Sequence, residues 1–193
     1  PGSFIGTAAI DATPNVHEVT ATAGAVTWSR AVQPATSKLY KDGWNALPLD
    51  VTGGLYVPPT GTHIVMGATE TLGSDNASLT LFSDNPGIPT SASAVNPNLS
   101  AFRLNAPATF VAPSSNPAKV KLSITAATGL ILNSSFSLGD GTPLRNNIAF
   151  YGMIIPNTAT LSTVDGSGHG FYLLPGLTST DPTRSGRVSL RTL

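Results

Sequence analysis

Short apolar runs alternate with glycine, proline and Asp-Gly along most of the chain, a pattern that predicts antiparallel strands joined by tight turns. Residues 119–125 alternate polar and apolar side chains with a period of two, which predicts a strand with one buried and one solvated face. The run 148–155 is continuously apolar and predicts a central strand covered on both sides. Asp140-Gly141, after the run that ends at Leu138, predicts a hairpin because its turn needs a positive φ that glycine adopts readily.

The same reasoning extends over the whole chain and leaves almost no helix. One or two helical turns are expected at 37–42, ended by Gly43. The expected strands are 3–9, 18–23, 25–32, 47–51, 54–57, 63–68, 77–82, 101–104, 108–111, 119–125, 130–138, 147–155, 170–174 and 186–191.

Glycines at 53–54, 129, 152 and 186 lie inside or beside these strands, where each can bend a sheet. A sheet of this many strands closes or splits into two layers. We therefore expect an all-β protein, an antiparallel barrel-like or sandwich fold with many short strands and Gly/Pro turns. The Pro/Ser/Asn-rich segment 83–100 is the natural divide of a single β domain, 1–193, with sub-halves 1–85 and 99–193.

Charge is scarce: ten Lys and Arg balance ten Asp and Glu, so only 10% of the 193 residues are charged, while 20 Ser and 24 Thr supply polar surface. This composition is typical of proteins outside the cell. No basic cluster could neutralise a run of phosphates, which argues against nucleic acid as a partner. No run reaches the length of a membrane span. The chain has no Cys, hence no disulfide and no Cys-ligated zinc, and it resembles a bacterial surface protein in this respect.

The C-terminal third carries a resemblance. It reads Phe136, Asp140-Gly141, Phe150-Tyr-Gly-Met-Ile-Ile-Pro156, Gly168-His-Gly170-Phe-Tyr-Leu-Leu-Pro-Gly176 and Ser185-Gly-Arg-Val-Ser-Leu190. This succession resembles the C-terminal β-rich modules of large exported proteins of Verrucomicrobia and Planctomycetes. The segments Trp44–Tyr56 and Ser3-Phe-Ile-Gly6 look like that group as well. The resemblance implies an all-β, secreted or surface-attached domain and supplies no catalytic residues. The opening Pro1-Gly2-Ser3 resembles the remnant of a removed tag, which would make the chain a domain excised from a longer protein.

Chemistry-bearing motifs are sparse. No Gly-x-Ser-x-Gly elbow, phosphate-binding Gly-x-x-x-x-Gly-Lys or EF-hand loop occurs, and nothing in the sequence pairs the two glutamates, Glu18 and Glu70. We expect no enzyme, no cofactor and no metal site. The Gly-rich loop around Asp165 and His169 is a candidate for presenting these two side chains to a ligand, although a plain hairpin turn that contains a histidine is the simpler explanation.

Aromatic residues offer a second candidate site. Trp44 lies beside Asp42 and Asn45 in an expected loop, and with Trp28 and Tyr56 it could form a platform on which a sugar ring stacks. The simpler reading is that Trp28 and Trp44 close the two ends of a barrel core.

These observations predict a non-enzymatic, extracellular or cell-surface β-domain of a bacterial protein with a structural or adhesive role. Its expected partners are other copies of itself or surface polysaccharide. Such assembly would use strand addition at an open sheet edge or burial of apolar patches between copies, and residues 3–9 and 188–193 are the expected pairing segments. A carbohydrate-binding module is the first alternative, and a viral capsid or decoration protein is the second.

Overall fold

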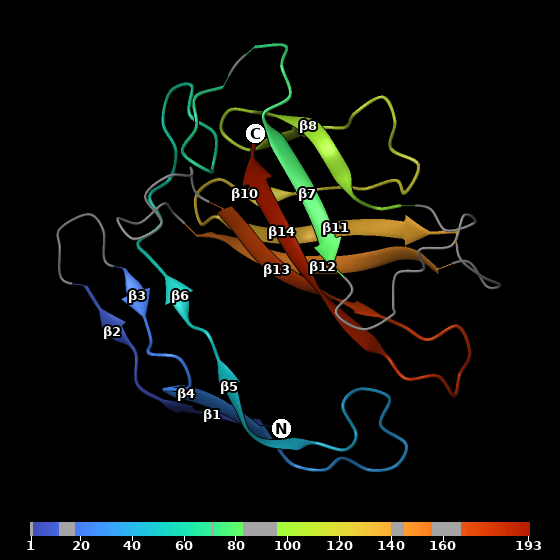
Figure 1. Ribbon diagram of the computed structural model, residues 1–193. Helices are drawn as coiled ribbons and strands as arrows, with labels where there is room; N and C mark the ends of the chain where they lie inside the picture. The colour runs from blue at the N-terminus through green and yellow to red at the C-terminus, as the bar shows by residue number, and fades with distance from the viewer. Residues whose placement is uncertain (1, 12–17, 71, 83–95, 140–144, 156–166) are drawn as a thin grey trace. The chain divides into compact units, whose positions relative to one another are not determined.

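A computed structural model of the chain describes residues 2–11, 18–70, 72–82, 96–139, 145–155 and 167–193 (Figure 1). These residues fold into two compact units, Pro1–Leu55 and Tyr56–Leu193. The predicted divide at 83–100 lies largely outside the described residues, and the boundary between the units falls at Leu55 and Tyr56. All regular structure in the described ranges is β, which confirms the predicted all-β class.

The N-terminal unit contains two small antiparallel sheets, with strand orders β1-β4-β5 and β2-β3-β6. Its strands are β1 (Gly2–Gly6), β2 (Ala9–Ile10), β3 (Val19–Thr20), β4 (Val26–Arg30), β5 (Trp44–Leu49) and β6 (Thr52–Gly53).

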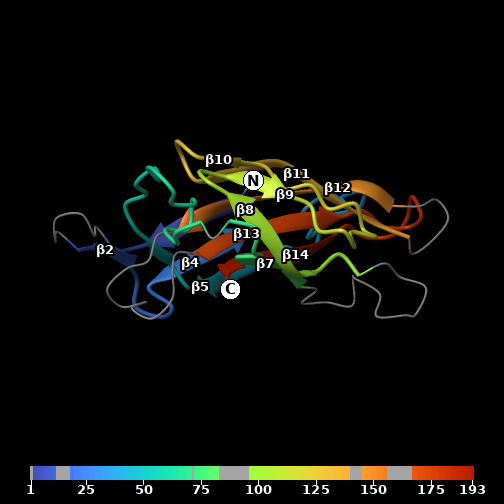
Figure 2. The same ribbon diagram turned by 90° about the horizontal axis from the view of Figure 1, so that it is seen from above.

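The C-terminal unit is one eight-stranded antiparallel sheet that curls into a nearly closed barrel, with strand order β10-β11-β12-β13-β14-β7-β8-β9. Figures 1 and 2 show β11, β12 and β13 running side by side. The strands are β7 (Ala77–Phe82), β8 (Leu99–Asn105), β9 (Thr109–Val111), β10 (Ile124–Thr125), β11 (Leu130–Leu138), β12 (Arg145–Ile155), β13 (Ser167–Leu174) and β14 (Arg184–Thr192).

Alternation along these strands builds the barrel core. Phe136, Phe150 and Tyr172 are almost fully buried, and the Phe136 and Tyr172 rings meet edge to face with centroids 5.3 Å apart. Burial of this apolar surface is the main stabilising contribution to such a unit. The predicted alternation at 119–125 is confirmed, since Val120, Leu122 and Ile124 are buried between exposed neighbours. Only Ile124–Thr125 of that segment is regular strand.

Paired glycines let neighbouring strands approach closely where the sheet curls. Gly152 lies opposite Gly170 in the β12–β13 register. A Cβ atom on either would press on backbone across the ladder, including the carbonyl of Tyr151 for Gly170. The expectation that Gly152 marks a bend fits this close approach.

The run 148–155 forms part of β12, which is an interior strand of the sheet as predicted. Its predicted cover on both faces is wrong. Tyr151 and Met153 are 44% and 52% exposed on the outer face, whereas Phe150 and Ile154 are buried on the inner face. Side chains pack only on the inner face of the sheet, so a continuous apolar run does not by itself show that both faces of a strand are covered.

The segment 63–68 is a tight turn rather than the predicted strand. The amide of Ile64 donates to the carbonyl of Ala68, and Gly67 takes a φ of 91°. Because the chain turns here, the consecutive residues Ile64, Val65 and Met66 are all buried, which a strand would not allow. The predicted strand 54–57 is also absent.

The helical turns predicted at 37–42 do not form. Tyr40 has a φ of 50°, and the amide of Gln33 donates to the carbonyl of Lys41 across the loop. A helix of six residues has too few hydrogen bonds to offset its nucleation, so loop closure prevails. The predicted turn at Asp140-Gly141 lies outside the described residues, while its flanking strands β11 and β12 pair antiparallel as expected.

Candidate functional site

The aromatic residues of the N-terminal unit gather on one face of the β1-β4-β5 sheet. Trp28 meets Trp44 edge to face with ring centroids 4.4 Å apart, and Phe4 lies nearly parallel to Trp28 at 5.4 Å. Tyr40 adds a second edge-to-face contact to Trp44 at 5.0 Å, and the Arg30 guanidinium lies 5.9 Å from the centre of the Tyr40 ring. We call these five residues the aromatic cluster.

Strand register explains why the aromatic cluster forms. Phe4 pairs with Trp28 across β1 and β4, and Arg30 pairs with Trp44 across β4 and β5, so their side chains share a face. Gly2 lies opposite Arg30 in the register. A Cβ atom on Gly2 would lie 2.7 Å from Nε1 of Trp28, so the absence of a side chain there makes room for the indole.

Three N–H groups in the aromatic cluster are buried without an acceptor among the described residues: Nε1 of Trp28, Nε1 of Trp44 and Nε of Arg30. The other end of the Arg30 guanidinium donates to the carbonyl of Leu39 over 3.3 Å. Buried donors normally find a partner, so such groups point to a ligand or ordered water. The structure thus brings together Trp28 and Trp44 of the predicted platform. It does not separate them as the two ends of a barrel.

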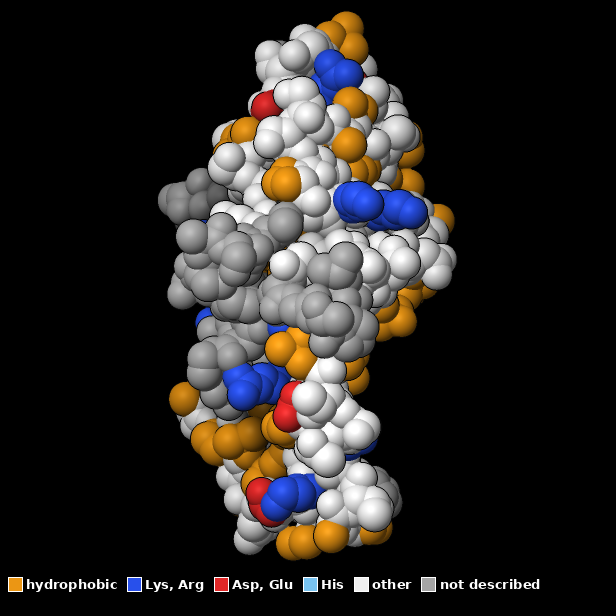
Figure 3. All heavy atoms as spheres, turned by 90° about the vertical axis from the view of Figure 1, so that its right-hand side faces the viewer, with side chains coloured by type: hydrophobic (Ala, Val, Ile, Leu, Met, Phe, Trp, Pro, Cys, Tyr) orange, Lys and Arg blue, Asp and Glu red, His pale blue; other side chains and the backbone are white. Residues whose placement is uncertain are grey.

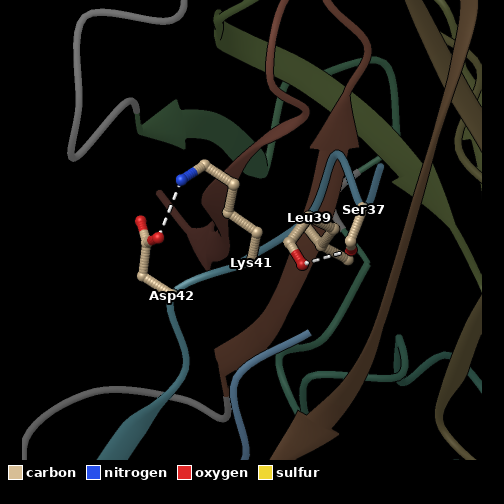
Figure 4. Close-up of polar contacts among 4 residues, drawn as sticks. All are labelled: Ser37, Leu39, Lys41 and Asp42. Carbon is tan, nitrogen blue, oxygen red and sulfur yellow. Dashed lines mark hydrogen bonds and ion pairs between the residues drawn. The ribbon is translucent and has the colours of Figure 1, made fainter. Parts of the chain in front are cut away.

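Two further predicted site residues lie nearby in the same unit. Asn45 accepts a hydrogen bond from Ser29 through Oδ1 over 3.2 Å, and Ser29 accepts from the amide of Ala46. Asp42 forms an ion pair with Lys41 over 2.7 Å, with both side chains well exposed (Figure 4). An exposed pair of this kind contributes little stability, so Asp42 is available to an external partner.

Tyr56 does not belong to the aromatic cluster. It belongs to the C-terminal unit, where its hydroxyl donates to the carbonyl of Ala126 over 2.7 Å and its ring packs on Gly129. Burial raises the pKa of Tyr56. These contacts anchor the connection between β10 and β11 and give Tyr56 a packing role there.

The loop candidate is only half described, because Asp165 lies outside the described residues. His169 is part of β13 and has Nε2 2.8 Å from Oγ of Ser167. Burial, and then the positive charge of Arg191, lower the pKa of His169 below its ordinary value. Within the described part of the chain no group of three or more His, Cys, Asp or Glu side chains could hold a metal ion.

A second surface was not anticipated from the sequence. Five apolar side chains emerge on the outer face of β11, β12 and β13, each between 38% and 52% exposed. Tyr151 lies opposite Phe171, with ring centroids 6.0 Å apart. We call this set the outer apolar band; its members are Leu132, Tyr151, Met153, Phe171 and Leu173.

Polar side chains border the outer apolar band. Met153 on β12 lies opposite His169 on β13, which lies opposite Ser189 on β14, and Ser189 lies opposite Thr80 on β7. We call these four positions the outer row. Figure 3 shows one face of the molecule, where orange side chains reach the surface in several places among white atoms, with separate Lys and Arg side chains in blue between them. The signal for the band was present in the sequence as apolar residues two apart, 151 with 153 and 171 with 173.

The chain matches no protein-family model, no curated protein and no solved structure. In the part of the chain that is described, no helix has the length and apolarity needed to cross a membrane.

Proposed function

We propose that this chain is a non-enzymatic structural or adhesive β-domain of a bacterial surface protein, and that it works by binding protein surfaces, including further copies of itself. The observation that carries the proposal is the outer apolar band. Its five side chains contribute nothing to the barrel interior, because Phe136, Phe150 and Tyr172 already fill the inner face. Contiguous exposed apolar side chains on a soluble domain favour a protein contact.

Charge supports the same conclusion. The net charge is zero, so two copies repel each other only weakly. The low charged fraction of 10% and the resemblance of residues 136–190 to modules of exported proteins favour a place outside the cell. A domain that binds through an apolar surface needs no reacting groups, in keeping with a structural rather than a catalytic role.

Light scattering over a concentration series tests the proposal. The mass of the chain should rise above 19.7 kDa as concentration increases. The double variant Met153→Lys/Phe171→Lys, called the band variant, should show a lower mass at every concentration. Thr80→Lys is the control for an added lysine, because it places one of these positive charges in the same outer row away from the band, and it should behave as the parent chain does. A parent chain that stays at 19.7 kDa throughout would reject the proposal.

A carbohydrate-binding role is the second candidate, and the aromatic cluster favours it. Phe4 is 67% exposed beside the two indoles, and an exposed aromatic ring suits the apolar face of a sugar. The edge-to-face packing of Trp28 on Trp44 leaves them without a shared flat surface, which weakens this candidate. Polysaccharide should shift tryptophan emission in the parent chain and in Tyr56→Phe, but not in Trp44→Ala.

A further inference from the structure

Strand β1 is an open edge of the β1-β4-β5 sheet. Among the described residues it pairs only with β4, on one side, and all five of its own residues are exposed. It contains no charged residue, no proline and no register shift. Natural proteins protect open edges with charged residues, prolines or bulges, because an unprotected edge pairs with other chains.

The opposite edge of the same sheet is blunted. Strand β5 contains Pro48, which has no N–H to donate. The β4–β5 register shifts between Trp28 and Arg30, and Ala46 takes a φ of 51°. The two edges of one sheet therefore differ, and β1 alone offers a regular ladder.

The register shows which groups of β1 are free. The amide of Thr7 donates to the carbonyl of Ala25, and this pair continues the β1–β4 register. Hydrogen-bonded and non-hydrogen-bonded pairs alternate in an antiparallel ladder. Ser3 and Ile5 therefore bond to β4, whereas the backbone N–H and C=O groups of Gly2, Phe4 and Gly6 point to the open side.

We propose that β1 pairs antiparallel with β1 of a second copy, about a two-fold axis at Phe4; this rests on the self-association proposed above. In that arrangement Phe4 lies opposite Phe4 of the other copy, and Gly2 lies opposite Gly6. All three outward-facing positions then meet outward-facing positions. The two glycines keep the flanks free of side chains where the copies approach, and the absence of charge in β1 removes repulsion. Two three-stranded sheets become one six-stranded sheet.

Phe4→Pro tests the backbone pairing specifically. Proline at this position removes an N–H that faces the open side and leaves the β1–β4 bonds in place, and sheet edges tolerate proline. Phe4→Ala is the matched control, because it removes the same ring and keeps the N–H. Near-ultraviolet circular dichroism from the Trp28–Trp44 pair reports whether each variant keeps the sheet.

The measurement is the mass of these variants in the band-variant background, where contact through the barrel is removed. The band variant should reach twice 19.7 kDa and stop there, since a two-fold pair uses both β1 edges. Adding Phe4→Pro should halve the mass, and adding Phe4→Ala should leave it a dimer.

A band variant that is monomeric while the parent chain assembles would overturn the β1 contact and keep the proposed function. A parent chain that is monomeric would overturn both. Loss of the dimer in both Phe4 variants would overturn pairing through the backbone.

A single cysteine provides an independent test of the register, since the chain has no other. Phe4→Cys, in either background, should form a disulfide-linked dimer on mild oxidation, because the two Cα atoms lie opposite each other within the range a disulfide spans. Ser3→Cys should not, because the register places Ser3 opposite Ile5 of the other copy. Equal cross-linking at the two positions would overturn the register.

Discussion

The two units of this chain reach stability by different means. The C-terminal unit closes its sheet around a core in which Phe102, Leu104 and Leu190 have no measurable exposure. In the N-terminal unit no described residue is fully buried, and its order depends on short ladders and on aromatic rings packed on an open face. A unit of 55 residues divided between two three-stranded sheets buries a smaller fraction of its surface, since burial rises with chain length.

The two units also differ in whether their strands have free edges at which another chain could pair. The eight-stranded sheet pairs both sides of its interior strands, so β14 has β13 on one side and β7 on the other. The prediction that 188–193 is a pairing segment is therefore wrong, because Val188 and Leu190 are locked in the core. The N-terminal segment keeps an open edge because its sheet is too small to close.

The largest expected effect comes from emptying the barrel core. Phe136→Ala should lower the free energy of unfolding by about 3–5 kcal/mol, because it removes a ring that is 1% exposed and leaves a cavity. Phe4→Ala, at 67% exposure, should lower it by less than about 1 kcal/mol. Urea denaturation followed by circular dichroism measures both. Similar decreases in the free energy of unfolding for Phe136→Ala and Phe4→Ala would contradict the view that only the C-terminal unit is stabilised by a buried core.

A buried amide provides the next contrast. Asn76 donates through Nδ2 to the carbonyl of Leu104 and accepts the Leu104 amide through Oδ1, which joins the start of β7 to β8. Asn76→Ala leaves both backbone groups unpaired and should lower the free energy of unfolding by about 2–4 kcal/mol. Asn45→Ala, which breaks an exposed bond to Ser29, should have an effect within about 0.5 kcal/mol in the same denaturation experiment.

Trp28→Ala should disorder one unit and spare the other. Trp28 is the centre of the aromatic cluster, touching both Phe4 and Trp44. Limited proteolysis should cut the variant first within residues 1–55, while the urea midpoint of the barrel stays within error of the parent. Simultaneous loss of both units would mean that they fold as one cooperative body.

The smallest expected effect is a pH dependence of the barrel. The pKa of His169 is lowered in the folded chain, so the unfolded chain takes up this proton first as the pH falls. Stability is complete above about pH 6.5, the ordinary value for histidine, and declines as the pH falls toward the lowered pKa. The decline should be small because His169 is only partly buried and solvent screens its charge. Urea midpoints from pH 7.5 to 5 should flatten in His169→Gln and keep their slope in His63→Gln.

Sequence pattern predicted the barrel well because a filled interior imposes alternation on its strands. The bounds expected for 77–82 and 130–138 agree with β7 and β11, and both strands alternate buried and open positions. Pattern failed where burial does not follow strand geometry, as in the turn that buries Ile64, Val65 and Met66 together. It also overstated the cover on β12, since an exposed Met153 and a buried Ile154 are both apolar.

The aromatic cluster was only partly predictable. Trp28 and Trp44 were singled out as residue types, but their contact depends on the β4–β5 register and on the shift between Trp28 and Arg30. Phe4 joins the aromatic cluster because β1 pairs with β4 on the side opposite to β5, and no local sequence pattern reveals this pairing. Tyr56 was grouped with them by type, and the structure places it in the other unit on the carbonyl of Ala126.

Residue-resolved amide exchange at low and high protein concentration is the most direct measurement of the claim that the small unit binds through its open edge. At low concentration, the amides of Phe4 and Gly6 should exchange quickly, whereas that of Ile5, bonded to β4, exchanges more slowly. Raising the concentration should slow exchange at Phe4 and Gly6 and leave barrel amides such as Val188 unchanged. Fast exchange at Phe4 and Gly6 at every concentration, in a chain that nevertheless assembles, would contradict the account.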